Sequence, residues 1–170
     1  MNTISEYSHY LSRCLTSEYF YIQEKYPKLC IIGCEVVVDG DIVSAFIRFS
    51  LRDKNEASQL SWMDFNHDFY LTSKEALGLP DSMLSFGRDF LNFNETNASK
   101  YDAKETRNRN IQVYLEGLVL AKQLTKSDAV FYFCEDGEDE LKVFSLPIVN
   151  GSSVLVDTYM KCFHHSNGND

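Results

Sequence analysis

The sequence has no long hydrophobic run, no disulfide framework and no secretory signal. No stretch of its 170 residues approaches 18 uninterrupted apolar positions, so we expect no membrane-spanning segment. The first ten residues, Met1 to Tyr10, lack the positive start and apolar core of a signal peptide. Five cysteines make an odd set that is too sparse for a disulfide scaffold. These absences predict a cytoplasmic protein with reduced thiols.

A basic patch is also missing. The net charge is −9, and the densest basic stretch, Lys100 to Arg109, also contains Asp102 and Glu105. A field of this sign repels phosphate backbones, so we expect no direct contact with nucleic acid. The same field accelerates the encounter with a basic protein.

Patterns that bind cofactors or metals are absent as well. The eight glycines are scattered and form no phosphate-binding loop. Cys30 and Cys34 would share one face of a strand, too far apart for an ordinary zinc chelate without bending. The segments 64–68 and 162–165 contain ligand types but no four convergent ligands. We therefore expect no cofactor and no metal.

Catalytic motifs are equally scarce. None of the four histidines belongs to a nucleophile elbow, a Cys–His signature or a zinc-protease pair. Only His67, flanked by Asp64 and Asp68, lies within the ordered middle of the chain. We expect a protein that is not an enzyme. A small enzyme that uses His67 and the nearby carboxylates remains an alternative.

The residues that are present suit one folded domain. Hydrophobic residues make up 44% of the chain and charged residues 24%, and ten Tyr and twelve Phe provide large apolar faces. This composition predicts a single domain over residues 1–163, followed by a flexible tail over 164–170.

The first third of the chain predicts a helix and a hairpin. Apolar residues recur at three- and four-residue steps from Ile4 to Tyr26, and Pro27 ends this helix. Strands over Cys30–Val38 and Ile42–Leu51 flank Asp39-Gly40, a hairpin turn sequence.

The middle of the chain is less regular. Leu60–Leu71 suits a strand or an irregular packed segment, and Ser73 can cap a short helix over Lys74–Leu79. Met83–Phe93 is apolar but is interrupted by Gly87. Asn92–Lys100 has the composition of a polar loop.

The last third predicts another helix and hairpin. Helical spacing covers Glu105–Leu124, and strands are expected over Ala129–Cys134 and Leu141–Ile148. Val154–Val156 extends the sheet or leads into a short helix over Asp157–Phe163. The order indicates an α+β fold: a mostly antiparallel or mixed sheet, with the N-terminal helix and one long later helix packed to one side of it.

The most acidic segment lies between the last two predicted strands. Five carboxylates occur in the six residues from Glu135 to Glu140. The register of a calcium-binding EF-hand loop is absent. A solvated hairpin tip accounts for the segment, although crowded carboxylates also suit a basic protein surface.

Four segments resemble a known family. They are the initial helix through Tyr26, the hairpin around Asp39-Gly40, the helix containing Tyr114–Leu118 and the strand Val130–Cys134. With the acidic balance, they resemble the immunity proteins of bacterial contact-dependent growth inhibition systems. That family shares no universal motif, so no residue role transfers by position.

The resemblance implies a cytosolic protein that binds the C-terminal domain of one cognate toxin, frequently a nuclease, and blocks its active site or substrate surface. An acidic inhibitor can compete for the basic surface that such a nuclease needs to hold phosphate. The hypothesised contacts are Asp136, Glu138, Asp139, Glu135, Glu140, Asp39 and Asp41. Another acidic adaptor or regulator remains an alternative function.

Overall fold

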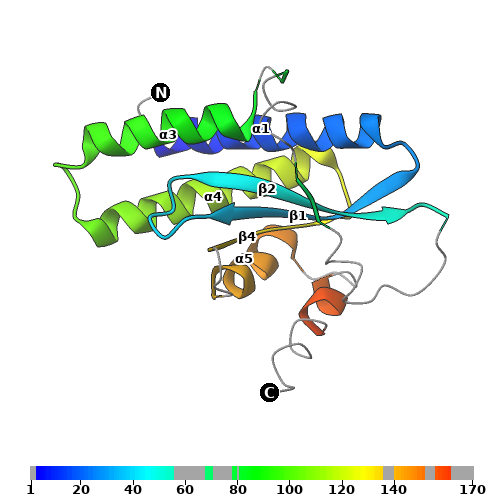
Figure 1. Cartoon of the computed structure of the whole chain (residues 1–170). Coiled ribbons are helices and arrows are strands. Elements are labelled where there is room, and N and C mark those ends of the chain that lie inside the picture. The colour runs from blue at the N-terminus through cyan, green and yellow to red at the C-terminus, as the bar shows by residue number, and fades with distance from the viewer. Residues whose placement is uncertain are drawn as a thin grey trace.

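The computed structural model describes residues 3–55, 68–70, 78–79, 81–135, 140–151 and 156–161 (Figure 1). Its helices and strands, in chain order, are α1 (Ile4–Lys25), β1 (Leu29–Val38), β2 (Ala45–Asp53), β3 (Asp68–Tyr70), α3 (Met83–Asn97), α4 (Ala103–Thr125), β4 (Val130–Glu135) and α5 (Glu140–Asn150). A further helical segment covers 156–161.

The strands form one mixed sheet in the order β3-β2-β1-β4. Strand β2 is antiparallel to both β1 and β3, whereas β4 runs parallel to β1. The predicted α+β class, with the N-terminal helix and a long later helix packed on a mixed sheet, is confirmed.

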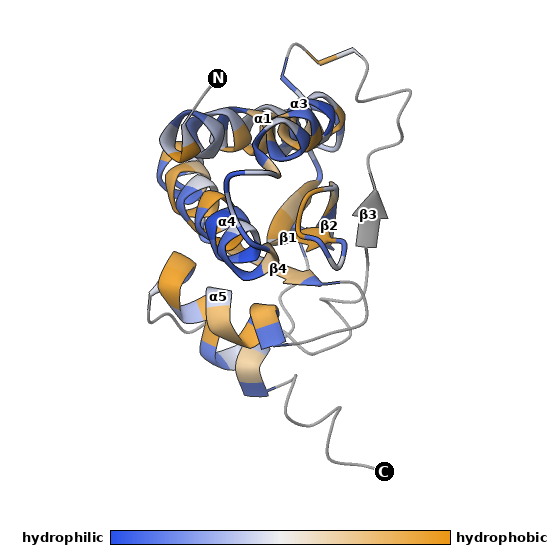
Figure 2. Ribbon diagram, turned by 90° about the vertical axis from the view of Figure 1, so that its left-hand side faces the viewer, coloured by the Kyte–Doolittle hydropathy of each residue, from blue (hydrophilic) through white to orange (hydrophobic). Residues whose placement is uncertain are grey.

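Helices lie on both sides of this sheet. The N-terminal helix and the long later helix share one face, as expected, and a helix that was predicted as a strand lies on the other side. Helices α1, α3 and α4 cover one face, and α5 lies on the other side, next to β4 (Figures 1 and 2). Buried apolar residues form two clusters: a large one beneath α1, α3 and α4, to which Leu141 and Val149 of α5 also belong, and a small one that includes Leu146 of α5.

The two long helices each begin with a capping box. Thr3 and Glu6 form a capping box at the start of α1, and Asp102 and Glu105 form another at α4. In each box the side chains satisfy two backbone donors that the helix itself leaves unpaired. Glu105 is therefore the third residue of α4, which explains why the helix begins two residues before the predicted boundary.

The second predicted hairpin is wrong, because residues 141–148 are helical. In α5, Leu141, Ser145, Leu146 and Val149 are buried at three- and four-residue steps. A short apolar run is compatible with a strand or a buried helix, and only the surrounding fold decides between them. Strand β4 pairs with β1 instead of a following strand.

Two other boundaries differ from the prediction. Strand β2 begins at Ala45, so residues 39–44 form a longer loop than the expected two-residue turn. Helix α3 extends to Asn97, so the first part of the predicted polar loop over Asn92–Lys100 is helical. The Ser82 side chain caps α3 by accepting the Ser85 N–H, which favours a helix start directly before the apolar run.

A bulge in β1 changes the placement of two cysteines. The pairing with β2 shifts between Ile31 and Gly33. Cys30 therefore packs against the small cluster, while Cys34 is fully buried in the large one. A regular strand would place them on one face, but the extra residue of a bulge reverses the alternation.

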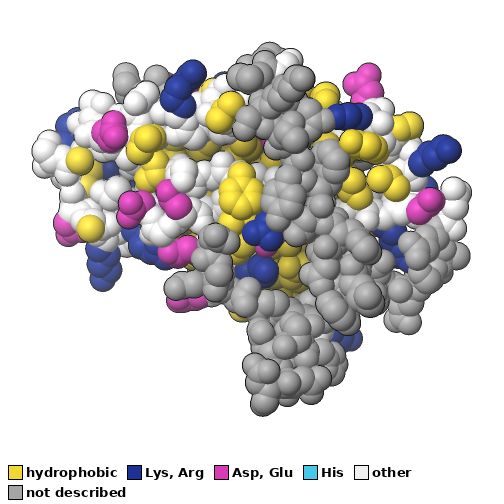
Figure 3. All heavy atoms as spheres, viewed as in Figure 1, with side chains coloured by type: hydrophobic (Ala, Val, Ile, Leu, Met, Phe, Trp, Pro, Cys, Tyr) yellow, Lys and Arg dark blue, Asp and Glu magenta, His cyan; other side chains and the backbone are white. Residues whose placement is uncertain are grey.

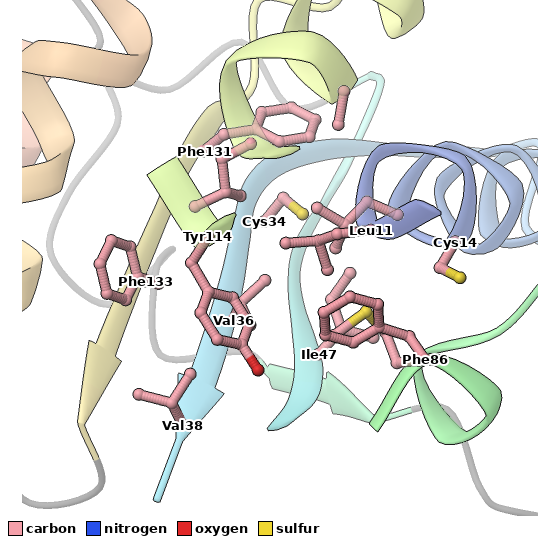
Figure 4. Packing of buried hydrophobic residues seen from close by; sticks show 14 of the residues in the cluster. Leu11, Cys14, Cys34, Val36, Val38, Ile47, Phe86, Tyr114, Phe131 and Phe133 are labelled. Atoms are coloured by element: carbon pink, nitrogen blue, oxygen red, sulfur yellow. The ribbon is translucent and has the colours of Figure 1, made fainter. Parts of the chain in front are cut away.

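The large cluster contains buried residues of α1, α3 and α4 and of the strands β1, β2 and β4. Figure 4 shows Val36 and Val38 of β1 and Phe133 of β4 on the same side of the sheet as Tyr114 of α4. The Tyr114 and Phe133 rings stack with centroids 5.8 Å apart. This packing holds α4 over the parallel β1–β4 pair.

Several predictions fall on residues that the structure does not describe. They are positions 60–67 and 71 of the predicted segment Leu60–Leu71, positions 74–77 of the predicted helix Lys74–Leu79, the acidic positions 136–139 and the tail over 164–170. Within the first segment, Asp68–Tyr70 forms β3, and residues 78–79 of the predicted helix are not helical.

Candidate functional site

The parallel pairing of β1 and β4 brings two acidic segments together. Val38, the last residue of β1, pairs with Glu135, the last residue of β4. The loop that follows β1 therefore lies beside Glu135, and a Cβ placed on Gly40 would lie 3.4 Å from Glu135 Oε1. Two hypothesised partner-binding segments thus meet at one end of the sheet.

Arg107 of α4 joins these two segments. Its Nη2 lies 2.7 Å from Glu135 Oε2, and its Nη1 donates to the Gly40 carbonyl at 2.9 Å. Only 15% of the Glu135 side chain is exposed. Charge-assisted hydrogen bonds of this kind orient both partners. The Glu135 carboxylate therefore has a structural role within the chain.

The Asp39 carboxylate is also engaged internally. It accepts hydrogen bonds from the backbone N–H groups of Val43 and Ser44 and from the Ser44 hydroxyl. Such local bonds are typical of Asp in tight loops. Ile42, which lies in the loop between Asp39 and Val43, is fully buried. Its φ is 54°, a backbone conformation rare for a β-branched residue.

Two more side chains of α4 hold this loop. Asn110 donates to the Asp41 carbonyl, and the Tyr114 hydroxyl donates to the Val43 carbonyl at 3.2 Å. Together with Arg107, these residues recur at three- and four-residue steps, so they lie along one face of α4. Helix α4 thus fixes the shape of the 39–44 loop.

Asp41 and Glu140 differ from the other two acidic residues. Both are exposed, and their carboxylates make no hydrogen bond or ion pair with the described part of the chain. We call Asp39, Asp41, Glu135 and Glu140 the carboxylate edge. In Figure 3, acidic side chains gather over the end of the molecule where the β1–β2 loop lies. The edge combines two internally held carboxylates with two that face solvent.

A buried ion cluster lies on the α5 side of the sheet. Glu35 of β1 is 6% exposed, and its two carboxylate oxygens lie 3.4 Å from Arg48 Nε and 3.4 Å from Lys142 Nζ. The Cys134 thiol donates to the same carboxylate. Because Lys142 belongs to α5, this cluster attaches α5 to β1 and β2. Sequence analysis missed it, since its members come from four separate elements.

Two tyrosines continue this polar region. The Tyr159 hydroxyl donates to the Tyr132 hydroxyl at 2.8 Å, and the rings lie 5.1 Å apart. Burial raises the pKa of Tyr159 to about 12 and that of Tyr132 well above its ordinary value. Both phenols therefore stay protonated at neutral pH, and the pair attaches the 156–161 segment to β4.

Helix α5 also covers the outer edge of β4. The Asn150 side chain accepts the Phe131 N–H and donates to the Phe131 carbonyl, at 2.7 and 2.6 Å. The Ser145 hydroxyl makes the same pair of contacts with Phe133. These side chains occupy backbone groups that an edge strand otherwise offers to another chain. Strand addition at these two residues is therefore blocked.

A second buried carboxylate lies on the opposite side of the sheet. Glu18 of α1 is 1% exposed, and its Oε1 accepts the Met83 N–H at the start of α3 at 2.7 Å. Burial raises the pKa of Glu18 to about 7, and the bond from Met83 opposes this shift. Glu18 ties two helices together and has no access to a ligand.

The described residues provide little for catalysis or metal binding. His67, on which the enzyme alternative depends, lies outside them. No group of three metal-ligating side chains occurs in the described ranges. Burial raises the pKa of the Cys14, Cys34 and Cys134 thiols, which keeps them from acting as thiolate nucleophiles.

Of the seven hypothesised contact residues, four lie among the described residues. The structure brings Asp39, Asp41 and Glu135 together at one end of the sheet, and Glu140 begins α5 five residues after Glu135. Asp136, Glu138 and Asp139 lie outside the described residues. The roles of Arg107 and Glu35 were missed, because each pairs with residues distant in the sequence.

Within the described ranges, no helix has the length and apolar character needed to cross a membrane.

Comparison of the chain with protein-family models, with curated proteins and with solved structures gives no match. A functional argument therefore depends on the residues and their geometry.

Proposed function

We propose that this protein is a bacterial immunity protein that binds a cognate toxin domain in the cytoplasm and neutralises it. The target is a basic nuclease domain, and the carboxylate edge meets the surface with which that domain holds phosphate. No bond is made or broken in this activity. The partner is a protein, and neither nucleic acid nor membrane takes part.

The observation that carries the proposal is that two solvent-facing carboxylates belong to backbone that the fold holds in place. Asp41 and Glu140 are exposed. Asp41 belongs to a loop held by Arg107, Asn110 and Tyr114, and Glu140 begins helix α5. Charges on a preformed backbone lose less conformational entropy on binding than charges on a mobile segment. These carboxylates therefore suit a protein partner better than a mobile acidic tail would.

The charge of the whole chain favours the same partner. With a net charge of −9, the protein attracts a basic domain over a distance of about one Debye length, roughly 8–10 Å at physiological salt. Long-range attraction of this kind mainly raises the association rate. An inhibitor that must capture a toxin before it reaches nucleic acid benefits directly from fast association.

The gene context tests the proposal first. The gene should follow directly after one that encodes a toxin with a C-terminal effector domain. The purified domain should bind the full chain, and co-expression of the chain should restore growth of cells that express the domain. Absence of both binding and protection would refute the proposal.

A pair of charge variants tests the assigned surface. The double variant Asp41→Asn/Glu140→Gln should lower the association rate constant about tenfold at low salt. The matched control Glu24→Gln/Glu95→Gln removes the same charge from exposed positions on α1 and α3. Equal rates for the two double variants would show that net charge alone, and not the carboxylate edge, guides association.

A further inference from the structure

The outward face of α5 is apolar. Val143, Phe144 and Ile148 are 38%, 48% and 50% exposed, and Pro147 between them is also exposed. Positions 143, 144, 147 and 148 lie side by side on a helix, so they form one continuous stripe. We call these four residues the α5 stripe. Figure 2 shows α5 as a largely hydrophobic helix, in contrast to the more hydrophilic α4.

The fold does not require this stripe to be apolar. Helix α5 already packs through its other face, where Leu141, Leu146 and Val149 are buried. An amphipathic surface helix has polar residues on its outer side, and a contiguous exposed apolar patch marks an interaction site. Leu84 and Leu91, the exposed apolar residues of α3, are seven positions apart and are separated by Arg88. The exposed apolar residues of α5 are therefore contiguous, unlike those of α3.

The α5 stripe is held rigidly. Lys142 pairs with Glu35 of β1, and the Ser145 and Asn150 side chains bond to the backbone of β4. These contacts fix both the position of the helix and its rotation about its own axis. A partner that docks on the stripe therefore meets a preformed surface, which lowers the entropic cost of association.

Charge decides which kind of partner fits. Glu140, the first residue of α5, is exposed, whereas the charge of Lys142 on the same helix is paired with Glu35. A second copy of the chain would bring another net charge of −9 against this surface. A basic protein gains from the same charges. The stripe, Glu140 and the net negative charge of the chain therefore complement a basic surface that contains an apolar side chain.

We propose that the α5 stripe is the hydrophobic part of the docking surface for the basic toxin domain. The partner buries an apolar side chain against Phe144 and Ile148, while its Lys or Arg side chains face Glu140. This inference rests on the proposed function and adds to it the anchor that supplies affinity. In protein interfaces a few desolvated apolar side chains carry most of the binding energy, and rim charges mainly govern the association rate.

The experiment uses the full chain and the purified toxin domain encoded directly upstream. The variant Phe144→Ser/Ile148→Ser should weaken the dissociation constant on the order of 30-fold or more, mainly through faster dissociation. The matched control Leu84→Ser/Leu91→Ser alters side chains of similar exposure, 48% and 45%, on the opposite side of the sheet. The control should change the dissociation constant less than about threefold.

Three other outcomes would overturn the inference. If the wild-type chain binds but the Phe144→Ser/Ile148→Ser variant binds within threefold of it, the α5 stripe is not the anchor and the proposed function stands. If the wild-type chain does not bind, both proposals fail together. If light scattering finds a wild-type dimer that this variant dissociates, a second copy of the chain occupies the stripe.

Discussion

The two sides of the sheet are built differently. The side beneath α1, α3 and α4 contains a large cluster of buried apolar residues with many aromatic rings. On the α5 side the buried cluster is small, and it adjoins the ion cluster around Glu35 and the exposed α5 stripe.

If the partner binds the α5 side, this difference separates stability from recognition. The large cluster contains more of the buried apolar residues and therefore contributes more to the free energy of folding. Helix α5 is held by its buried apolar residues and by polar contacts that specify its position, and it leaves apolar and acidic side chains exposed. A protein that binds through the α5 side can vary the exposed residues there without weakening its main core.

The same substitution on each side should show the largest contrast. Phe90 is fully buried and contacts the rings of Tyr7, Phe86 and Tyr114, whereas Phe144 is 48% exposed. Phe90→Ala should lower the free energy of unfolding by about 3–5 kcal/mol, through lost transfer energy and a new cavity. Phe144→Ala should lower it by less than about 1 kcal/mol. Urea unfolding measures both, and equal losses would remove the contrast.

The buried carboxylate of the first side should make stability depend on pH. The pKa of Glu18 is about 7 in the folded chain, against about 4.3 when it is unfolded. The folded state therefore retains a proton that the unfolded state releases. The stability that this proton provides is complete below about pH 4 and is lost as the pH rises through 7.

Glu18→Gln removes this titration and keeps a side-chain oxygen for the Met83 N–H. Between pH 5 and pH 8 the wild-type chain should lose about 2–3 kcal/mol of unfolding free energy from this titration, and the variant should not lose it. The difference in stability between variant and wild type should therefore shift by that amount in favour of the variant as the pH rises. Denaturant unfolding at both pH values measures this shift. The control Glu24→Gln, at an exposed position of the same helix, should leave the pH dependence unchanged.

The buried carboxylate of the second side should act through its two cations. Glu35→Gln removes the charge that lies between Arg48 and Lys142, whose side chains are 22% and 17% exposed. Loss of one member of a fully buried pair costs about 3–5 kcal/mol, and partial exposure of the cations reduces this to about 2 kcal/mol. Because Lys142 lies on α5, amide exchange should accelerate first in that helix. Exchange that increases equally in α1 would contradict the local role of this cluster.

Two helical glycines should give the smallest effects, with opposite signs. A Cβ on Gly117 of α4 would lie 2.6 Å from Leu11 Cδ2 and 2.9 Å from Leu11 Cγ, whereas a Cβ on Gly87 of α3 meets nothing within 4 Å. Gly117→Ala should cost about 1–2 kcal/mol, because the close contact between α1 and α4 must open. Gly87→Ala should gain up to about 1 kcal/mol from helix propensity. Thermal unfolding distinguishes these outcomes, and a stabilising Gly117→Ala would show that Leu11 can move away.

Sequence patterns predicted the elements whose evidence is local. The spacing of apolar residues located α1 and α4 to within two residues at each end, and β-branched residues located β1. Helix α3 was missed although Ser82 precedes it, because Gly87 and the polar residues after Phe93 obscured the helical period. The acidic surface and the α+β class followed from composition and element order.

The candidate site was predictable only in part. Acidic composition identified Asp41 and Glu140, which are exposed, but it also included Asp39 and Glu135, whose carboxylates bond within the chain. Nothing local identifies the role of Glu135, because the Arg107 that binds it is 28 residues away in the sequence. The partners of Asp39 are only four and five residues away, but they lie in a loop that was predicted to be a two-residue turn.

The sequence alone determined charge, composition and the periods that make a segment helical or extended, since each is a property of neighbouring residues. Tertiary structure decided that β4 pairs in parallel with β1, that residues 140–150 are a helix, and that Glu35 meets Arg48 and Lys142. These outcomes depend on which distant segment occupies the adjacent position. Strand pairing, burial of a short apolar run and desolvation of an ion pair are all set by that neighbour.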